Sequence, residues 1–209
     1  METGKKKETN PIKKIYVLTF LLLILVGCHK QKTPDMKPPK GGFVEYYYDE
    51  GGEIYYGGTN PLLGPFNAPQ KDLEEQCNFY LVNIKDKEGI VIRNIVRDHI
   101  HDQWNITEFR EDGSVKNTFL DGEMNFLSAD INYFNEQNRV TKHVLLDEDD
   151  SVVGTEITVY LEDGITYHQV FYYNEKGELD SFDEYLPPSY NEFIERDVSE
   201  APSEYLKLK

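Results

Sequence analysis

A seven-residue pattern recurs along the chain and constrains its fold more than any other feature. It reads aromatic, variable, Glu, variable, Gly or Asn, variable, aliphatic, and Tyr173–Leu179 shows it in full. The further copies are Tyr48–Ile54, Phe109–Val115, Phe134–Val140, Tyr160–Thr166 and, in degenerate form, Leu146–Val152. From Phe134 on, successive copies begin 12, 14 and 13 residues apart, a spacing that gives a strand, a turn and the next strand in sequence.

The residue types in the pattern are those of a tight hairpin turn. Asp or Asn near its start can accept hydrogen bonds from backbone N–H groups two residues on. Gly or Asn at the fifth position of the pattern supplies the left-handed conformation that closes a type I turn with a G1 bulge. The pattern therefore predicts these structural turn positions: Gly52, Gly113, Asn138, Gly164 and Gly177.

The segments between the turns have the periodicity of strands. In Ile157–Leu161 the odd positions form an apolar face, as in a half-buried strand. No segment of the core predicts a long helix, and only residues 69–77 leave room for one short helix. We therefore predict an all-β fold, an antiparallel meander of repeated β-hairpins over residues 43–186, followed by an irregular C-terminal tail over residues 187–209.

Two copies with their flanks, Tyr133–Thr141 and Tyr172–Asp180, resemble the YD repeats of RHS-type proteins. The resemblance covers about a third of the chain, and its motif has low specificity because any type I turn with a G1 bulge converges on it. Large RHS proteins wind many such repeats into shells, but the few irregularly spaced copies here imply no shell. The resemblance implies a curved array of β-hairpins and carries no catalytic residue.

The N-terminal residues have the layout of an export signal. Five lysines precede an apolar run from Ile15 to Val26, which is shorter than the ~20 residues that a transmembrane helix needs. The run ends in Leu25-Val26-Gly27-Cys28, which resembles a bacterial lipobox. The resemblance implies cleavage between Gly27 and Cys28, diacylation of the Cys28 thiol and a signal peptide over residues 1–27. The alternative is an ordinary signal peptide with a coincidental cysteine.

The lipobox reading predicts where the mature protein resides. Residues 28–42 are rich in Pro, Lys and Gly without apolar periodicity, so we expect a flexible tether behind the lipidated cysteine. The expected location is the cell envelope, with the membrane as a partner through the lipid anchor. His29 stands where an Asp commonly retains lipoproteins in the inner membrane, which favours the outer membrane if the cell is Gram-negative.

Charge narrows the classes of partner. The first 27 residues hold five of the 22 basic and two of the 38 acidic residues, so the mature chain has 17 against 36, a net charge of −19. Nucleic acid and anionic lipid headgroups are therefore poor partners, whereas a basic protein would be attracted. An acidic surface that only keeps the protein soluble is the simpler interpretation.

Few residues carry a chemical signature. With Cys28 lipidated, Cys77 has no partner for a disulfide, and without a nearby His it is expected to be buried and inert. His99 and His101 would share one side of a strand and could hold Zn²⁺ if a third ligand joined them; the alternative is an exposed strand end. The acidic run Asp147–Asp150 lacks the spacing of a calcium loop and reads as a solvated turn. We expect no cofactor.

The 15 tyrosines, dense at Tyr46–Tyr48 and recurring along the strands, suit either a recognition face for sugar or protein or the strands themselves. No catalytic constellation is present, so we predict a non-enzymatic binding or scaffolding protein whose partner is another envelope protein or a glycan. Two alternatives remain: an immunity protein that neutralises a basic toxin, and a metal-dependent enzyme that uses His99 and His101.

Overall fold

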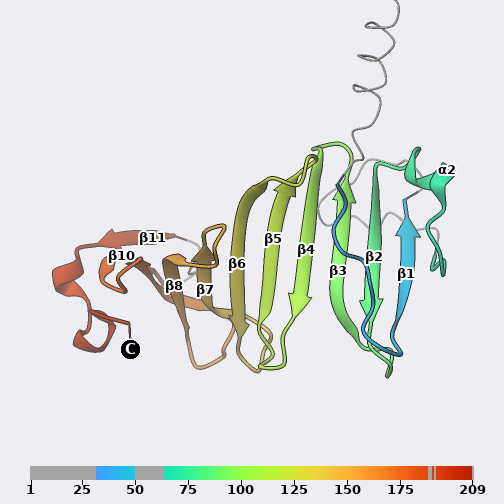
Figure 1. The fold of residues 1–209 in the computed structure, drawn as a ribbon. Helices are drawn as coiled ribbons and strands as arrows, with labels where there is room; N and C mark the ends of the chain where they lie inside the picture. Colours follow the sequence, from blue (N-terminus) through green and yellow to red (C-terminus); the bar gives the residue numbers. More distant parts are fainter. Residues whose placement is uncertain (1–31, 50–63, 188–189, 191, 209) are drawn as a thin grey trace, which may run out of the picture. The chain divides into compact units, whose positions relative to one another are not determined.

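The computed structural model describes residues 32–49, 64–187, 190 and 192–208. Contacts divide the chain after Thr33, and the fold belongs to the unit Pro34–Lys209. Within the described residues this unit is one antiparallel sheet of eleven strands, in which every strand pairs with its neighbours in sequence (Figure 1). The predicted all-β meander is confirmed.

The strands are β1 (Phe43–Tyr48), β2 (Phe79–Lys85), β3 (Val91–Asp98), β4 (Gln103–Phe109), β5 (Val115–Asp121), β6 (Phe126–Phe134), β7 (Val140–Leu146), β8 (Val152–Tyr160), β9 (Tyr167–Asn174), β10 (Leu179–Tyr185) and β11 (Phe193–Arg196). One short helix, α2 (Lys71–Glu74), lies within the range where the sequence leaves room for it. Two 3₁₀ turns follow the sheet, η1 (Val198–Glu200) and η2 (Ser203–Tyr205). The last residues are therefore only partly irregular, since β11 lies inside the expected tail.

The hairpin turns follow one hydrogen-bond scheme. In six hairpins of the described part of the chain, the N–H of the first turn residue donates to the carbonyl of the fifth, and the N–H of the fourth donates to the carbonyl of the first. This is the type I turn with a G1 bulge. The six turns span residues 86–90, 110–114, 121–125, 135–139, 147–151 and 174–178.

The fourth residue of each of these turns has a positive φ. Gly113, Asn138 and Gly177 do so as the pattern predicts, and Gly164 does so in a turn that is one residue longer. Gly52 lies outside the described residues. In the turn 121–125 the left-handed residue is Met124.

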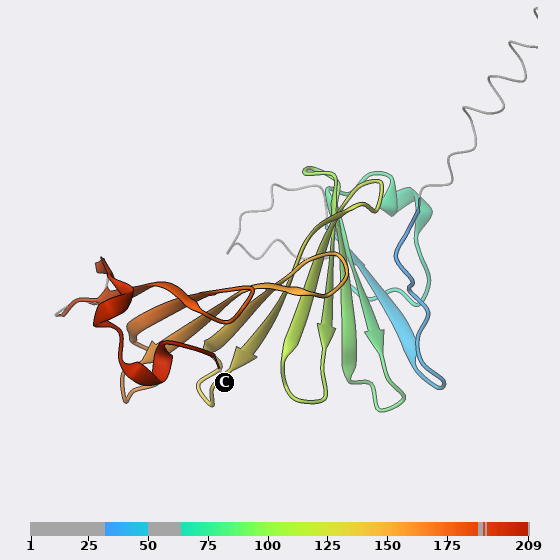
Figure 2. The ribbon, with the colours of Figure 1, turned by 60° about the vertical axis from the view of Figure 1, so that its left-hand side comes forward.

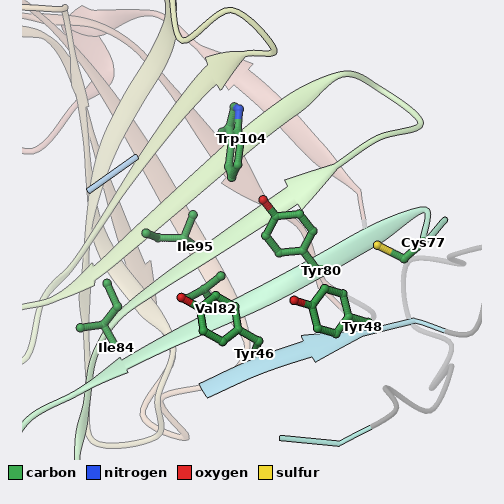
Figure 3. Packing of buried hydrophobic residues seen from close by; sticks show 8 residues of the cluster. All are labelled: Tyr46, Tyr48, Cys77, Tyr80, Val82, Ile84, Ile95 and Trp104. Carbon is green, nitrogen blue, oxygen red and sulfur yellow. The ribbon is translucent and has the colours of Figure 1, made fainter. Parts of the chain in front are cut away.

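Alternation along the strands separates an apolar from a polar face. Val82, Ile95 and Ile106 are cross-strand partners on one face, and their neighbours Asn83, Asn94 and Thr107 are partners on the other. We call the first the apolar face and the second the polar face. Figure 3 shows side chains of β1 to β4 projecting from the apolar face.

The apolar face holds three clusters of buried side chains rather than one core. The first is Tyr46, Tyr48, Cys77, Tyr80, Val82, Ile84, Ile95 and Trp104; the second is Ala129, Val144 and Leu146; the third is Phe171, Tyr173, Leu179 and Phe182. They follow one another along the sheet from β1 to β10. Since one sheet has no second sheet to bury its apolar face, other segments have to cover it.

Segments outside the strands cover the two ends of that face. Met36, Phe66 and Leu73, all N-terminal to β2, pack on the first cluster. Val198, Ala201, Tyr205 and Leu208 pack on the third. Lys116 Nζ on β5 lies 2.6 Å from Asp150 Oδ1 in the turn between β7 and β8. The sheet therefore coils and brings this turn to β5 (Figure 2).

The folded unit begins before Phe43. Pro34 is buried, Met36 contacts the first cluster, and Arg93 Nη1 donates to the Asp35 carbonyl at 3.3 Å. The last part of the expected tether, residues 34–42, therefore belongs to the compact unit. The residues of the expected signal peptide, with Gly27 and Cys28, lie outside the described residues. Among the residues that the structure describes, no helix has the length and apolar character to cross a membrane.

Candidate binding groove on the polar face

The two histidines that the sequence brings together lie in a turn and not on a strand. β3 ends at Asp98, and residues 99–102 connect it to β4. His99 packs against the Tyr80 ring, with centroids 5.9 Å apart, and burial followed by Arg97 lowers its pKa. His101 Nδ1 lies 2.7 Å from Asp98 Oδ2. The expectation that both rings project from one side of a strand is therefore wrong, because the strand ends before them.

The other candidate residues are the carboxylates of Asp147–Asp150 and the thiol of Cys77. In the described parts of the chain, no group of three or more His, Cys, Asp or Glu side chains is placed to hold a metal ion. Two carboxylates of the turn 147–151 have partners: Asp149 accepts from the Ser151 N–H within the turn, and Asp150 pairs with Lys116 on β5. Cys77 is buried, as predicted, and burial raises the pKa of its thiol to about 11, which makes it a poor nucleophile.

A chain of polar side chains crosses the polar face from β4 to β8. Thr107 Oγ1 donates to Asn117 Oδ1 at 3.0 Å, and Asn117 Nδ2 donates to Asp130 Oδ1 at 2.9 Å. His143 on β7 then stands between two carboxylates, with Nε2 3.8 Å from Asp130 Oδ2 and Nδ1 3.3 Å from Glu156 Oε2. The register that pairs these strands places all five side chains on one face.

A row of aromatic rings continues this face across β8 to β11. The rings of Tyr160, Tyr167, Tyr185 and Phe193 succeed one another with centroid distances of 5.2, 5.4 and 5.7 Å. Tyr167 remains 44% exposed and Phe193 56% exposed. The fold thus leaves two rings of this row open to solvent and two half-buried, and aromatic residues are enriched at recognition surfaces.

A groove of about 390 Å³ lies between the polar chain and the aromatic row. Its lining comes from β7 to β10 and from the turn between β6 and β7, and it consists of Asn138, Arg139, Val140, His143, Glu156, Thr158, Tyr160, Tyr167, Val170, Tyr172 and Tyr185. The volume is within the range of small-ligand pockets.

The groove tyrosines are neutral hydrogen-bonding groups. Burial, followed by the charge of Tyr167, raises the pKa of Tyr160 to about 12, and its hydroxyl donates to the Val140 carbonyl at 2.8 Å. Burial and the hydrogen bond to Asp183 raise the pKa of Tyr172, whose hydroxyl donates to Asp183 Oδ2 at 2.9 Å. The site can therefore offer aromatic surface, hydroxyl groups and carboxylates to a ligand.

The sequence points to part of this site only. Among the dense N-terminal tyrosines, Tyr46 and Tyr48 belong to the first apolar cluster. Tyr160 is the first residue of a pattern copy, whereas no motif of the sequence marks Tyr185. Strict alternation along β9 would put Tyr167 and Tyr172 on opposite faces, and the shifted register between β8 and β9 brings both to the groove. No family model matches the chain, and no curated protein matches it.

Proposed function

We propose that the protein is a lipid-anchored component of the cell envelope with a non-enzymatic binding role, and that it holds another envelope macromolecule in the groove on its polar face. The observation that carries the proposal is the aromatic row of Tyr160, Tyr167, Tyr185 and Phe193 at the groove, in which Tyr167 and Phe193 are exposed. Soluble domains seldom leave such apolar surface open without a binding role.

The rest of the site supports binding rather than turnover. His143 lies between Asp130 and Glu156, with no serine or threonine nucleophile among its hydrogen-bond partners in the described residues. The partner expected from the sequence is an envelope protein or a glycan, and both present groups that tyrosine rings and hydroxyls bind.

Site-directed photo-crosslinking in cells tests the role of the groove. A photoreactive phenylalanine derivative replaces Tyr167 in one variant and Glu123 in another. Glu123 is exposed in the turn between β5 and β6, at the opposite end of β6 from Asn138. We expect a discrete adduct from position 167 and none from position 123. Equal adducts from both positions, or none from either, would remove the groove as the binding site.

The lipid anchor is tested separately. The Leu-Val-Gly-Cys order predicts that wild-type protein incorporates a fatty-acid probe and partitions with membranes. The Cys28→Ala variant should lose the label and accumulate as uncleaved precursor. A labelled Cys28→Ala protein would refute lipidation at this cysteine and leave the groove proposal untouched.

A further inference from the structure

We infer that the partner of the groove is a basic polypeptide segment, whose arginine or lysine side chains lie along the aromatic row. This inference rests on the proposed binding function and names the chemistry of the ligand. It follows from charges that the fold leaves uncompensated, from the geometry of the rings and from the charge of the whole chain.

The first argument is a pair of like charges held together beside the row. Asp183 on β10 and Glu195 on β11 are direct cross-strand partners, two residues from the partners Tyr185 and Phe193. Like charges placed opposite each other destabilise a sheet. Asp183 is only 7% exposed and accepts a hydrogen bond from Tyr172, and no basic side chain pairs with it in the described part of the chain. A cation from outside would relieve this repulsion.

The groove itself places a carboxylate beside tyrosine rings, because Glu156 lines it together with Tyr160, Tyr167 and Tyr172. Glu156 pairs with His143, whose other ring nitrogen faces Asp130 outside the lining, and Arg139 of the lining is exposed in the turn 135–139. Carboxylates beside tyrosine rings form the kind of site that takes a guanidinium or ammonium group, because the ring faces attract cations and the carboxylates neutralise them.

The length of the row favours a polymer over a small amine. Its three centroid distances of 5.2, 5.4 and 5.7 Å give at most about 16 Å, which roughly five residues of an extended chain would cover. The net charge of −19 after the expected signal would also speed the approach of a basic partner. A neutral glycan would gain nothing from either charge argument.

The test uses the full chain in neutral detergent and two decapeptides, (Arg-Gly)₅ and (Gln-Gly)₅, with a neutral tetrasaccharide as a third probe. Binding is measured by titration calorimetry. We expect (Arg-Gly)₅ alone to bind, with an affinity that falls as salt is raised.

Two matched double variants separate the charges beside the aromatic row from the overall charge. Asp183→Asn with Glu195→Gln, and Glu111→Gln with Glu123→Gln, each remove two negative charges, and the second pair lies in exposed turns. Removing the Asp183/Glu195 pair should weaken peptide binding about tenfold, and removing the turn pair less than about twofold. Thermal unfolding confirms that both are folded. Equal losses in both variants would mean that net charge alone attracts the peptide, which overturns the inference.

Replacing Arg139 should change the affinity for the peptide in the opposite direction. Its side chain lines the groove and would repel a cationic ligand, so Arg139→Gln should strengthen peptide binding about twofold. Tyr167→Phe keeps the ring and should bind the peptide nearly as well as wild type, whereas Tyr167→Ala should bind it about fivefold more weakly. Weaker binding in Arg139→Gln would contradict a cationic ligand.

The outcomes distinguish this inference from the function on which it rests. If the tetrasaccharide binds, Tyr167→Ala abolishes that binding and the peptide does not bind, then the groove function stands and the basic ligand is wrong. If no probe binds and crosslinking at position 167 equals that at position 123, the proposed function fails as well.

Discussion

The fourth residue of each type I hairpin turn has a positive φ, and this conformation restricts which amino acids fit there. Gly113 has φ +80°, and a Cβ added there would meet no other atom within 4 Å, so only backbone conformation opposes a side chain. Gly154 on β8 offers a comparison, because it has no positive φ and its added Cβ would lie at ordinary contact distances.

Gly113→Ala should therefore destabilise the protein by about 1 kcal/mol, since alanine is strained in the left-handed region. Gly113→Asn should be close to neutral because Asn138 fills the same position in another turn. Gly154→Ala should be neutral or stabilising by about 0.5 kcal/mol, through loss of freedom in the unfolded chain. Denaturant unfolding measures all three. Equal losses at positions 113 and 154 would contradict the left-handed assignment.

Carboxylates that cap the turns link stability to pH. Asp121 Oδ1 accepts from the N–H groups of Glu123 and Asn125, and Oδ2 accepts from the Asn125 side chain. The side-chain and backbone hydrogen bonds from Asn125 lower the pKa of Asp121. Because the folded pKa lies below the unfolded value of about 3.9, this stabilisation is complete above that pH and is lost as pH falls through the folded pKa.

Asp121→Ala should be less stable than wild type at pH 7, and the difference between their free energies of unfolding should shrink as pH falls below about 4. Asp121→Asn should lie close to wild type, since Asn135 and Asn174 accept the same pair of backbone hydrogen bonds. Urea unfolding from pH 7 to pH 3 measures the differences. A gap between wild type and Asp121→Ala that does not change with pH would contradict this linkage.

How far the sequence predicts the turns and the site depends on the range of each interaction. The positive φ of Gly113 and Asn138 is predictable from the sequence because these residue types alone favour it. Met124 has the same conformation without that signal, because pairing between β5 and β6 imposes it. The contact between Tyr160 and Tyr167 depends on an irregular register between β8 and β9, which residue types do not specify.

At the scale of elements, the C-terminal segment serves as the cover of the third apolar cluster. The Tyr205 ring in η2 stacks on Phe171, with centroids 4.2 Å apart and planes inclined by 6°. Phe171 is fully buried under it. The sequence suggested an irregular tail because β11 has four residues and the 3₁₀ turns have three each, too short for a periodic pattern.

Tyr205→Ala should uncover Phe171 and destabilise the protein by about 2 kcal/mol, below the figure for a fully buried aromatic because Tyr205 is half-buried. Its neighbour Leu206 is 45% exposed, so Leu206→Ala provides the control. We expect Leu206→Ala to change the free energy of unfolding by less than about 0.5 kcal/mol. Chemical denaturation followed by circular dichroism compares them. Similar losses in the two variants would indicate that the segment does not cover the cluster.

At the scale of the whole molecule, the meander has the connectivity of a repeat protein. Each strand pairs with its sequence neighbours, and the first and third clusters share no residue. In such arrays stability is the sum of local units and their interfaces, so the two ends can open separately. The polar-face groove, built on β7 to β10, would then depend on the C-terminal end of the sheet.

This independence is testable with two core variants. Ile95 on β3 and Phe171 on β9 are both fully buried, so replacing either with alanine should cost at least about 2 kcal/mol locally. Hydrogen exchange resolved by strand should show Ile95→Ala accelerating exchange in β1 to β4, with β9 and β10 near wild type, and Phe171→Ala doing the reverse. Binding of (Arg-Gly)₅ should then survive Ile95→Ala and weaken in Phe171→Ala. If each variant instead accelerates exchange equally in every strand, the eleven strands unfold as one cooperative unit, and the coiling of the sheet couples its ends.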